Sequence, residues 1–340
     1  MDKLMRRNSG APFALSALAL AVSMGVAGAA SADTLSVQGS WLDFKPGDDA
    51  RTYAIECTDC SDTSNIKAFP NKDYESKFED TFSASFKWTH ELSGRGLWGS
   101  DDIAIGGGFF TEETETTTMI ANYQAGGNIG TPYGTIDSSS TGANGKNQDE
   151  VWFATGDIEL GWNRQHGNSD VRYHVGLRTQ FMEYERNAIQ DLSSSNVYNG
   201  EETSEFFGIG PRVGVSIKKP LGTSKNIALI GSVSGGVMYG KLKRDFSVTA
   251  DTDAVDDLRD RSSREWVPFM DAEAGFAYNI EEGISLELGY TASYQDDIIL
   301  LGSVCTDDYY DDVKPYNPSC GDDESSAITH GPFLRMTAEF

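Results

Sequence analysis

Apolar and polar residues alternate with a period of two in many segments of this chain. In the segment 152–162, every second residue from Trp152 onward is apolar or glycine, and Asp157 and Glu159 lie between them. A period of two places successive side chains on opposite faces of a β-strand. Tryptophans close both ends of this segment, as aromatic girdles do in membrane-spanning β-barrels. The chain is therefore expected to be all-β, with strands that have one apolar face.

Ten segments share this pattern, at about 34–44, 77–90, 101–112, 150–163, 170–184, 204–217, 226–242, 265–280, 284–296 and 327–340. Five long polar connections alternate with four short ones; the long ones cover 45–76, 113–149, 185–203, 243–264 and 297–326. The short ones cover 91–100, 164–169, 218–225 and 281–283. Long extracellular loops and short periplasmic turns are typical of outer-membrane barrels, whose strand number is even. We predict an antiparallel transmembrane β-barrel of about ten strands, with eight or twelve as alternatives.

The first 32 residues have the pattern of a secretory signal peptide. Lys3, Arg6 and Arg7 precede a run of small apolar residues over 11–30, and an A-x-A cleavage signature follows at 30–32. The run is nearly long enough to span a bilayer, so an uncleaved anchor is the alternative, but its alanine and glycine content is weakly hydrophobic. We expect 1–32 to be cleaved and 33–340 to form one β-barrel domain in the bacterial outer membrane.

The chain is strongly acidic, with 52 acidic and 27 basic residues and a formal net charge of −25. This charge repels phosphates and the sequence has no concentrated basic patch, so a nucleic-acid partner is not expected. Much of the acidity falls in the long connections, above all in 297–326. Clustered carboxylates suit divalent cations, but Asp251 and Asp253 lack the rest of an EF-hand pattern. Solvated acidic loops are the simpler interpretation, and neither a metal site nor a cofactor is predicted.

Strand parity predicts which side chains face the lumen. If phenylalanine, tryptophan and leucine face lipid, then charged residues of the opposite parity point inward. The predicted lumen-lining residues are Asp157, Glu159, Arg172, His174, Arg178, Arg212, Asp271, Glu273, Glu287 and Arg335, with Glu339 at the end. A barrel of ten strands is little wider than one filled by its own side chains. An ion-pair network that plugs the lumen and a narrow polar path for ions therefore both remain open.

The four cysteines fall in two of the long connections. Cys57 and Cys60 lie in the first, and Cys305 and Cys320 lie in the last. An even number of cysteines in an oxidising compartment predicts disulfides. We favour the local pairs Cys57–Cys60 and Cys305–Cys320, whereas the alternative pairings would join the first and last loops. A zinc site is a weaker interpretation, because the second pair is too widely spaced.

Signs of an enzyme are weak. The four histidines are His90, His166, His174 and His330. A hydrolytic site needs a histidine assembled with serine or acidic partners. No such motif accompanies His174 or His330, the two histidines that could approach chemistry. The chain is therefore not expected to be an enzyme, and an outer-membrane protease is a remote alternative.

Short glycine and proline motifs in the second half suggest a family. They are the segment 207–214, with the sequence FGIGPRVG, Gly240 at the end of a glycine-rich strand, and the closing segment 330–335, with the sequence HGPFLR. Over 204–340 the chain resembles the Legionella-type major outer membrane protein family, which implies a pore-forming barrel. The terminal Phe340 on an amphipathic last strand resembles the signal that the barrel-assembly machinery recognises.

Two functions follow as expectations. The first is a pore, of low conductance or gated, with a preference for cations because its mouth is acidic. The alternative is a barrel with a plugged lumen that acts in adhesion or envelope integrity, through long acidic loops that contact host or envelope ligands. In both cases the expected surroundings are outer-membrane lipid and lipopolysaccharide, and conductance measurements would separate the two.

Overall fold

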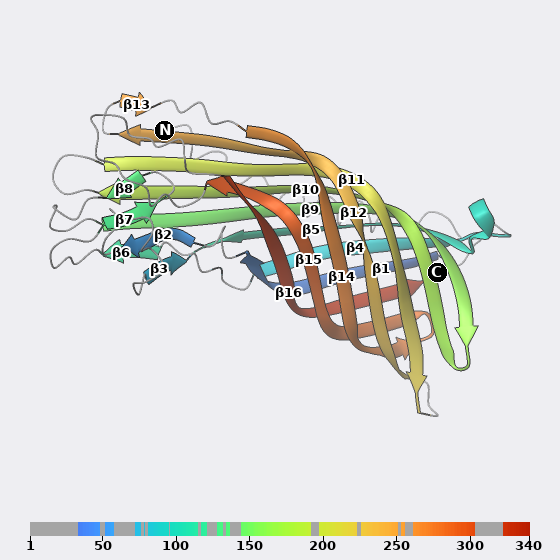
Figure 1. Ribbon diagram of the computed structural model, residues 1–340. Helices are drawn as coiled ribbons and strands as arrows, with labels where there is room; N and C mark the ends of the chain where they lie inside the picture. Colours follow the sequence, from blue (N-terminus) through green and yellow to red (C-terminus); the bar gives the residue numbers. More distant parts are fainter. Residues whose placement is uncertain are drawn as a thin grey trace.

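The computed structural model describes residues 33–47, 52–57, 72–75, 78, 81–94, 96–114, 117–120, 128–131, 134–136, 144–191, 197–222, 226–250, 253–255, 261–302 and 322–340. Ten long strands form a closed wall (Figure 1). They are β1 (Asp33–Pro46), β4 (Thr81–Glu91), β5 (Asp102–Glu113), β9 (Asn144–His166), β10 (Ser169–Asp191), β11 (Val197–Leu221), β12 (Ile227–Ala250), β14 (Arg261–Glu281), β15 (Ile284–Gly302) and β16 (Asp322–Glu339).

Each strand of this wall pairs with its neighbours along the chain, and every pairing is antiparallel. The last strand returns to the first, because β16 pairs with β1 from Thr34 opposite Glu339 to Pro46 opposite Ala327. Closure leaves no unpaired edge, which is what a sheet needs in lipid. The prediction of a ten-stranded antiparallel barrel is confirmed.

Several strands are longer than predicted. The additional residues lie at the end of the barrel that has the long connections. β10 continues to Asp191 and β11 begins at Val197, so most of the predicted loop 185–203 is a continuing hairpin. β12, likewise, reaches Ala250. Figure 1 shows β9 to β12 extending beyond the rest of the wall. The apolar alternation ends where the outer face leaves lipid, whereas the hydrogen bonds of the ladder continue.

Short strands occupy three of the predicted loops. β2 (Thr52–Cys57), β3 (Lys72–Glu75), β7 (Asn128–Thr131) and β8 (Gly134–Ile136) form a separate four-stranded sheet. β6 (Thr117–Ile120) pairs with β9, and β13 (Asp253–Val255) pairs with β12. The predicted loops 45–76, 113–149 and 243–264 therefore contain regular structure. The segments are short and mostly polar, so they carry little of the alternation by which strands are recognised in a sequence.

The other end of the barrel has short turns. The turn between β9 and β10 is Gly167-Asn168, and the turn between β14 and β15 is Glu282-Gly283. Gly167 and Gly283 have φ angles of 65° and 81°, which glycine adopts without the steric cost of a side chain. The turn between β4 and β5 is longer and includes the 3-10 turn η2 (Leu97–Gly99). Long and short connections therefore alternate except between β10 and β11, where the continuing hairpin leaves 192–196 between the two strands.

The outer face of the wall is apolar. Leu177 on β10 and Val213 on β11 are 52% and 58% exposed, although both belong to regular strands. Aromatic side chains such as Trp41 and Trp266 lie at the end of this belt nearest the long connections. Such an outward band is what a barrel presents to lipid. Within the part of the chain that the structure describes, no helix is long and apolar enough to cross a bilayer.

Phe78 and Phe82 lie on opposite faces of the wall, although both have the same parity within the predicted strand segment 77–90. Phe82 is 55% exposed on the outer face, whereas Phe78 packs inside the barrel, with its ring centroid 5.0 Å from that of Phe44. Phe78 precedes the first residue of β4, so the parity of the strand does not extend to it.

Candidate functional site: the barrel lumen

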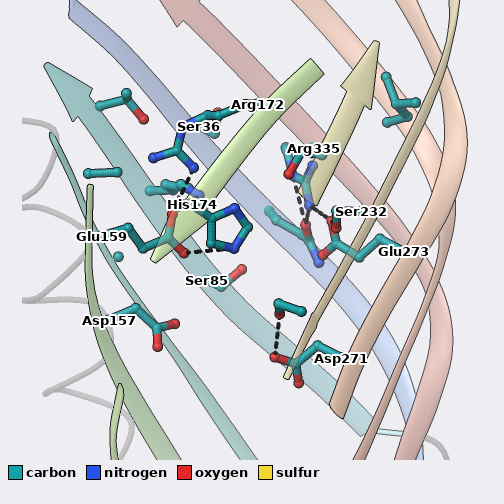
Figure 2. Close-up of a pocket in the computed structure, with 18 of the residues that line it drawn as sticks. Ser36, Ser85, Asp157, Glu159, Arg172, His174, Ser232, Asp271, Glu273 and Arg335 are labelled. Carbon is teal, nitrogen blue, oxygen red and sulfur yellow. Dashed lines mark hydrogen bonds and ion pairs between the residues drawn. The ribbon is translucent and has the colours of Figure 1, made fainter. Parts of the chain in front are cut away.

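The inner face encloses a cavity of about 960 Å³ that is lined by all ten predicted lumen residues and by Glu339. The cavity reaches the short-turn ends of the strands, where Glu91, Asp170 and Lys218 belong to its lining. Toward the long connections it ends near Leu42 and Phe153. Figure 2 shows charged side chains from opposite parts of the wall directed into this space.

Glu159 on β9 is the centre of the main ion-pair network. One of its carboxylate oxygens lies 2.7 Å from Lys87 Nζ and 2.9 Å from Arg172 Nη1, and the other lies 3.0 Å from Arg212 Nη1. The Glu159 side chain is only 2% exposed, so its charge depends on these partners. Arg172 also binds Asp102 at 2.7 Å. The network therefore joins β4, β5, β9, β10 and β11.

Asp157 extends this network across the lumen. It accepts a hydrogen bond from Arg178 Nε at 2.9 Å and lies 2.8 Å from Arg212 Nη1. Arg178, on β10, also lies 2.8 Å from Asp271 on β14. The strands β11 and β12 lie between β10 and β14 in the wall. Asp271 accepts a further hydrogen bond from Ser293 Oγ on β15 at 2.8 Å. Side chains thus connect parts of the wall that no backbone ladder joins directly.

A second network surrounds Arg335 on β16. Its guanidinium lies 2.5 Å from Glu273 on β14 and 3.1 Å from Glu287 on β15, and its Nε donates to Gln38 Oε1 on β1 at 2.8 Å. This arrangement links the last strand with the first across the closing seam. Within the two networks, Arg172, Arg178, Arg212 and Arg335 each have at least one carboxylate partner, as buried charges require.

His174 lies beside the main network. Its Nε2 is 3.8 Å from Glu159 Oε1, and neither ring nitrogen makes a hydrogen bond in the structure. His90 instead contacts Asp33 at 2.7 Å, and His330 contacts the Tyr290 hydroxyl at 2.7 Å on the outer face. His166 is in the last position of β9. The four histidines therefore lie at four separate places.

An apolar layer fills the barrel beyond the cavity, toward the long connections. Its buried side chains come from every barrel strand except β4 among the residues that the structure describes. They are Leu42, Phe44, Phe110, Val151, Met182, Tyr184, Phe206, Met238, Leu242, Val267, Phe269, Ile298, Ile299, Leu300, Leu301 and Ala327. These side chains come from nearly the whole circumference of the barrel and form one contiguous cluster. The cluster therefore closes the cross-section of the lumen at this level.

The segment Ile298–Leu301 is the unusual part of this layer, because four consecutive strand residues are all at most 1% exposed. A strand in the wall would expose every second side chain. Between Gln295 and Ile299 the register with β16 is interrupted, and β15 has two more residues than β16 across the interruption. The Leu300 amide donates to Ser204 Oγ on β11 at 2.9 Å, and β15 contacts β11 and β12. The segment is therefore folded inward.

Buried ion pairs also lie beyond the apolar layer, nearer the long connections. Arg186 Nε lies 3.0 Å from Asp149 Oδ1, and Arg244 contacts Glu202 at 2.5 Å; all four side chains are at most 1% exposed. The lumen therefore changes from charged to apolar and back to charged along its axis. The sequence-based interpretation treated 113–149, 185–203 and 243–264 as loops, so it missed these residues.

Sequence reasoning also missed Lys87, Asp102 and Gln38, which lie on the inward parity of predicted strands. The sequence also contains a pattern that indicates the apolar layer. Pairs such as Phe109-Phe110 and Phe206-Phe207 put aromatic rings on both faces of one strand, which indicates a level where both faces of the wall are apolar.

The remaining predicted sites are the cysteines, the signal peptide and the terminal Phe340. Cys57 ends β2, but its side chain and the residues Cys60, Cys305 and Cys320 lie outside the described residues, as does 1–32. Phe340 is 59% exposed at the short-turn end, where its amide donates to the Asp33 carbonyl at 2.8 Å. Among described residues, no group of three or more potential ligands is arranged to hold a metal ion.

Three solved structures that resemble this chain are distant from it in sequence. The outer membrane protease OmpT from Escherichia coli is 8% identical with a TM-score of 0.43, covering 91% of this chain and 97% of that chain. The translocator domain of autotransporter NalP from Neisseria meningitidis is 12% identical with a TM-score of 0.35, covering 97% and 96%. The attachment invasion locus protein Ail of Yersinia pestis is 9% identical with a TM-score of 0.24, covering 91% and 99%. At these TM-scores none of them bears on the function of this chain.

The comparison with curated proteins finds no match. The family model described as Legionella pneumophila major outer membrane protein precursor matches residues 36–334, which span nearly the whole barrel from β1 to β16. Together with the closed antiparallel wall and its apolar outer belt, this match places the chain in the outer membrane. The chain belongs to the Legionella pneumophila major outer membrane protein family.

Proposed function

We propose that this protein is a gated outer-membrane pore of low conductance that prefers cations. The observation that carries the proposal is the charged cavity of about 960 Å³, which extends from the short-turn mouth up to the apolar layer. A lumen that served only as a packed core would be filled by side chains at this level. A polar space of this size can instead hold water and ions.

The apolar layer is the gate in this proposal. An apolar constriction opposes ion passage because water and ions are unstable within it. Ile298–Leu301 is the part best suited to move, since it lies next to an interruption in the β15 ladder. It can move outward together with the Asp322–Ser325 end of β16 that pairs with it, and this leaves the pairing of the other strands intact. Met182 and Phe206, in contrast, belong to uninterrupted ladders of the wall.

Cation preference follows from the balance of charges in the lining. The cavity is lined by nine carboxylate and seven cationic side chains, counting histidine as neutral. Glu91, Asp170 and Glu339 are exposed near the mouth, outside the two ion-pair networks. An excess of carboxylates over cationic side chains in the lining of a narrow pore favours cations.

Planar-bilayer recording of the purified full chain tests the proposal. The wild type is expected to show small, infrequent channel events, with a reversal potential in a KCl gradient that indicates passage of K⁺ over Cl⁻. Leu300→Ser puts a polar group into the apolar layer and is expected to raise the open probability. Leu300→Val keeps the layer apolar and serves as the matched control.

A second variant tests the inward fold itself. Deleting Asp296 and Asp297 removes the two residues by which β15 exceeds β16, so that the ladder can continue without interruption. The segment Ile298–Leu301 then returns to the wall, and the variant is expected to conduct more often than the wild type. Absence of channel events for the wild type and for both opening variants, at every voltage tried, would overturn the proposal.

The same apolar layer supports a second candidate, a closed barrel that acts at the surface. In this case β9 to β12, which extend beyond the rest of the wall, would support loops that bind host or envelope ligands (Figure 1). A protein with intact adhesion that never conducts, together with adhesion lost on deletion of the tip 192–196 between β10 and β11, would favour this function over the pore.

A further inference from the structure

Lys241 on β12 and Arg264 on β14 form a pair of cationic side chains on the outer face of the barrel. The two residues are register partners, so their side chains lie side by side on the same face. Both are exposed. Among the residues that the structure describes, no carboxylate oxygen lies within 4.0 Å of either cationic group.

The pair lies just beyond the aromatic end of the apolar belt. On each strand, the residue two positions nearer the belt is aromatic: Tyr239 on β12 and Trp266 on β14. Their ring centroids are 4.7 Å apart, and their exposed fractions are 41% and 63%. Phe207 on β11, which is 60% exposed, is the register partner of Lys241 on its other side. Aromatic rings of this kind lie at the level of lipid headgroups. The two cations are one strand repeat, about 7 Å, further out, where the phosphates of a lipid lie.

This pair is an exception in an acidic ring. On the other strands, the first charged outward residues beyond the belt are mostly carboxylates: Glu113 on β5, Glu150 on β9, Glu183 on β10, Glu205 on β11 and Asp296 on β15. The nearby Lys243 is bonded to Asp245, and Lys45 on β1 lies 2.9 Å from Asp43. Glu265 follows Arg264 but has the opposite strand parity. Among the described outward residues at this level, these carboxylates repel anionic lipid, whereas Lys241 and Arg264 attract it.

We propose that Lys241 and Arg264 bind a phosphate group of an outer-leaflet glycolipid, while Tyr239 and Trp266 contact its acyl and sugar portion. Arginine can bind two phosphate oxygens at once and lysine supplies a further charge-assisted hydrogen bond. A phosphate on a lipid also gains from the neighbouring aromatic rings, which a free phosphate does not reach. This site is independent of conduction through the lumen.

Binding of a bis-phosphorylated glucosamine disaccharide lipid (lipid A) to the full chain in detergent micelles tests the inference. The double variant Lys241→Gln/Arg264→Gln is expected to bind this lipid at least about tenfold more weakly than the wild type, which corresponds to about 1.4 kcal/mol. Arg264→Lys should give an intermediate loss, because the charge stays and the bidentate geometry is lost. Lys219→Gln is the matched control, since Lys219 is an exposed lysine near the short-turn end.

The second arm identifies the source of the phosphate. The same lipid with its phosphates removed should bind the wild type as weakly as the intact lipid binds the double variant, and millimolar inorganic phosphate should not displace the intact lipid. Equal binding by wild type and double variant would overturn the inference. Displacement by inorganic phosphate would also overturn it, because it would show a simple anion site. Circular dichroism of each variant verifies that the barrel has folded.

Discussion

Gln180 on β10 donates a hydrogen bond from Nε2 to Oε1 of Gln295 on β15, with a nitrogen-to-oxygen distance of 3.0 Å. Three strands, β11, β12 and β14, separate the two along the wall, so this bond crosses the lumen. Both side chains are at most 3% exposed. The pair lies between the charged cavity and the apolar layer, next to the interruption in β15. It ties the base of the inward segment to the opposite wall.

Removing the carboxylate at the centre of the main network should destabilise the barrel. Glu159→Gln leaves Lys87 without its carboxylate partner, whereas Arg172 and Arg212 keep Asp102 and Asp157. Because the Lys87 side chain is itself 39% exposed, water compensates part of the loss, and we expect about 1.5 kcal/mol, the lower end for a hydrogen bond to a charged group. Urea unfolding in phospholipid vesicles measures the change. Glu282→Gln, in an exposed turn, should leave the unfolding free energy unchanged; an equal loss in both variants would contradict the role of the network.

A charge on the outer belt should destabilise the protein in lipid. Leu177 is 52% exposed on the outer face, so Leu177→Arg places a guanidinium among acyl chains. The expected cost is about 2–4 kcal/mol near the midplane of the bilayer. Asn168→Arg, in the turn between β9 and β10, is the control and should cost nothing measurable. If Leu177→Arg unfolds at the urea concentration of the wild type, this face does not contact lipid.

Neutralising the acidic mouth should reverse the charge balance of the cavity. The triple variant Glu91→Gln, Asp170→Asn and Glu339→Gln leaves six carboxylates against seven cationic side chains in the lining. The preference for cations should disappear and a weak preference for anions should replace it. Reversal potentials in a KCl gradient measure this change. Glu282→Gln lies outside the lining and should keep the wild-type value; an unchanged triple variant would show that the mouth does not set selectivity.

The long-connection end of the barrel should lose stability as the pH rises. Burial, together with the charges of Glu265 and Asp297, raises the pKa of Glu324 above its usual value, and Arg261 opposes this shift. Burial and the carboxylates of Asp296 and Glu265 likewise raise the pKa of Asp297. A carboxyl group with a raised pKa in the folded state binds its proton more tightly there than in the unfolded chain. Stability is therefore greatest at low pH and falls as the pH rises through the folded-state pKa.

Glu324→Gln tests this pH dependence. The variant removes the repulsion, so it should unfold at a higher urea concentration than the wild type at pH 8. At a pH below the usual range of carboxyl groups, the two proteins should unfold at the same concentration. A constant difference at all pH values would indicate that the substitution acts through packing and not through charge.

Phe340 should influence assembly more than stability. Its ring is 59% exposed and makes no ring contact within the described part of the chain, while its backbone pairs with Asp33. Phe340→Ala is therefore expected to slow folding by the barrel-assembly machinery and to leave the urea midpoint of the folded protein unchanged. Phe340→Trp keeps an aromatic terminus and should assemble at the wild-type rate. Equal assembly rates for all three proteins would remove the proposed role of this residue.

The sequence alone indicated about ten barrel strands, with eight or twelve as alternatives, and the face on which most strand side chains lie. Parity decides this face, because successive side chains of a strand point to opposite sides whatever the rest of the chain does. For this reason the alternation of residues is enough to assign Asp157 and Arg335 to the inner face. Strand ends were less accurate, since the extension of β10 to Asp191 carries no lipid-facing alternation.

The tertiary structure decided which inward side chains meet and where the lumen is closed. Arg178 reaches Asp271, and Gln180 reaches Gln295, because closure brings together strands that are distant in the sequence. The inward fold of Ile298–Leu301 depends on an interruption of pairing that no local pattern announces. Parity is a property of single strands, whereas the filling of the lumen depends on how the strands are arranged around it.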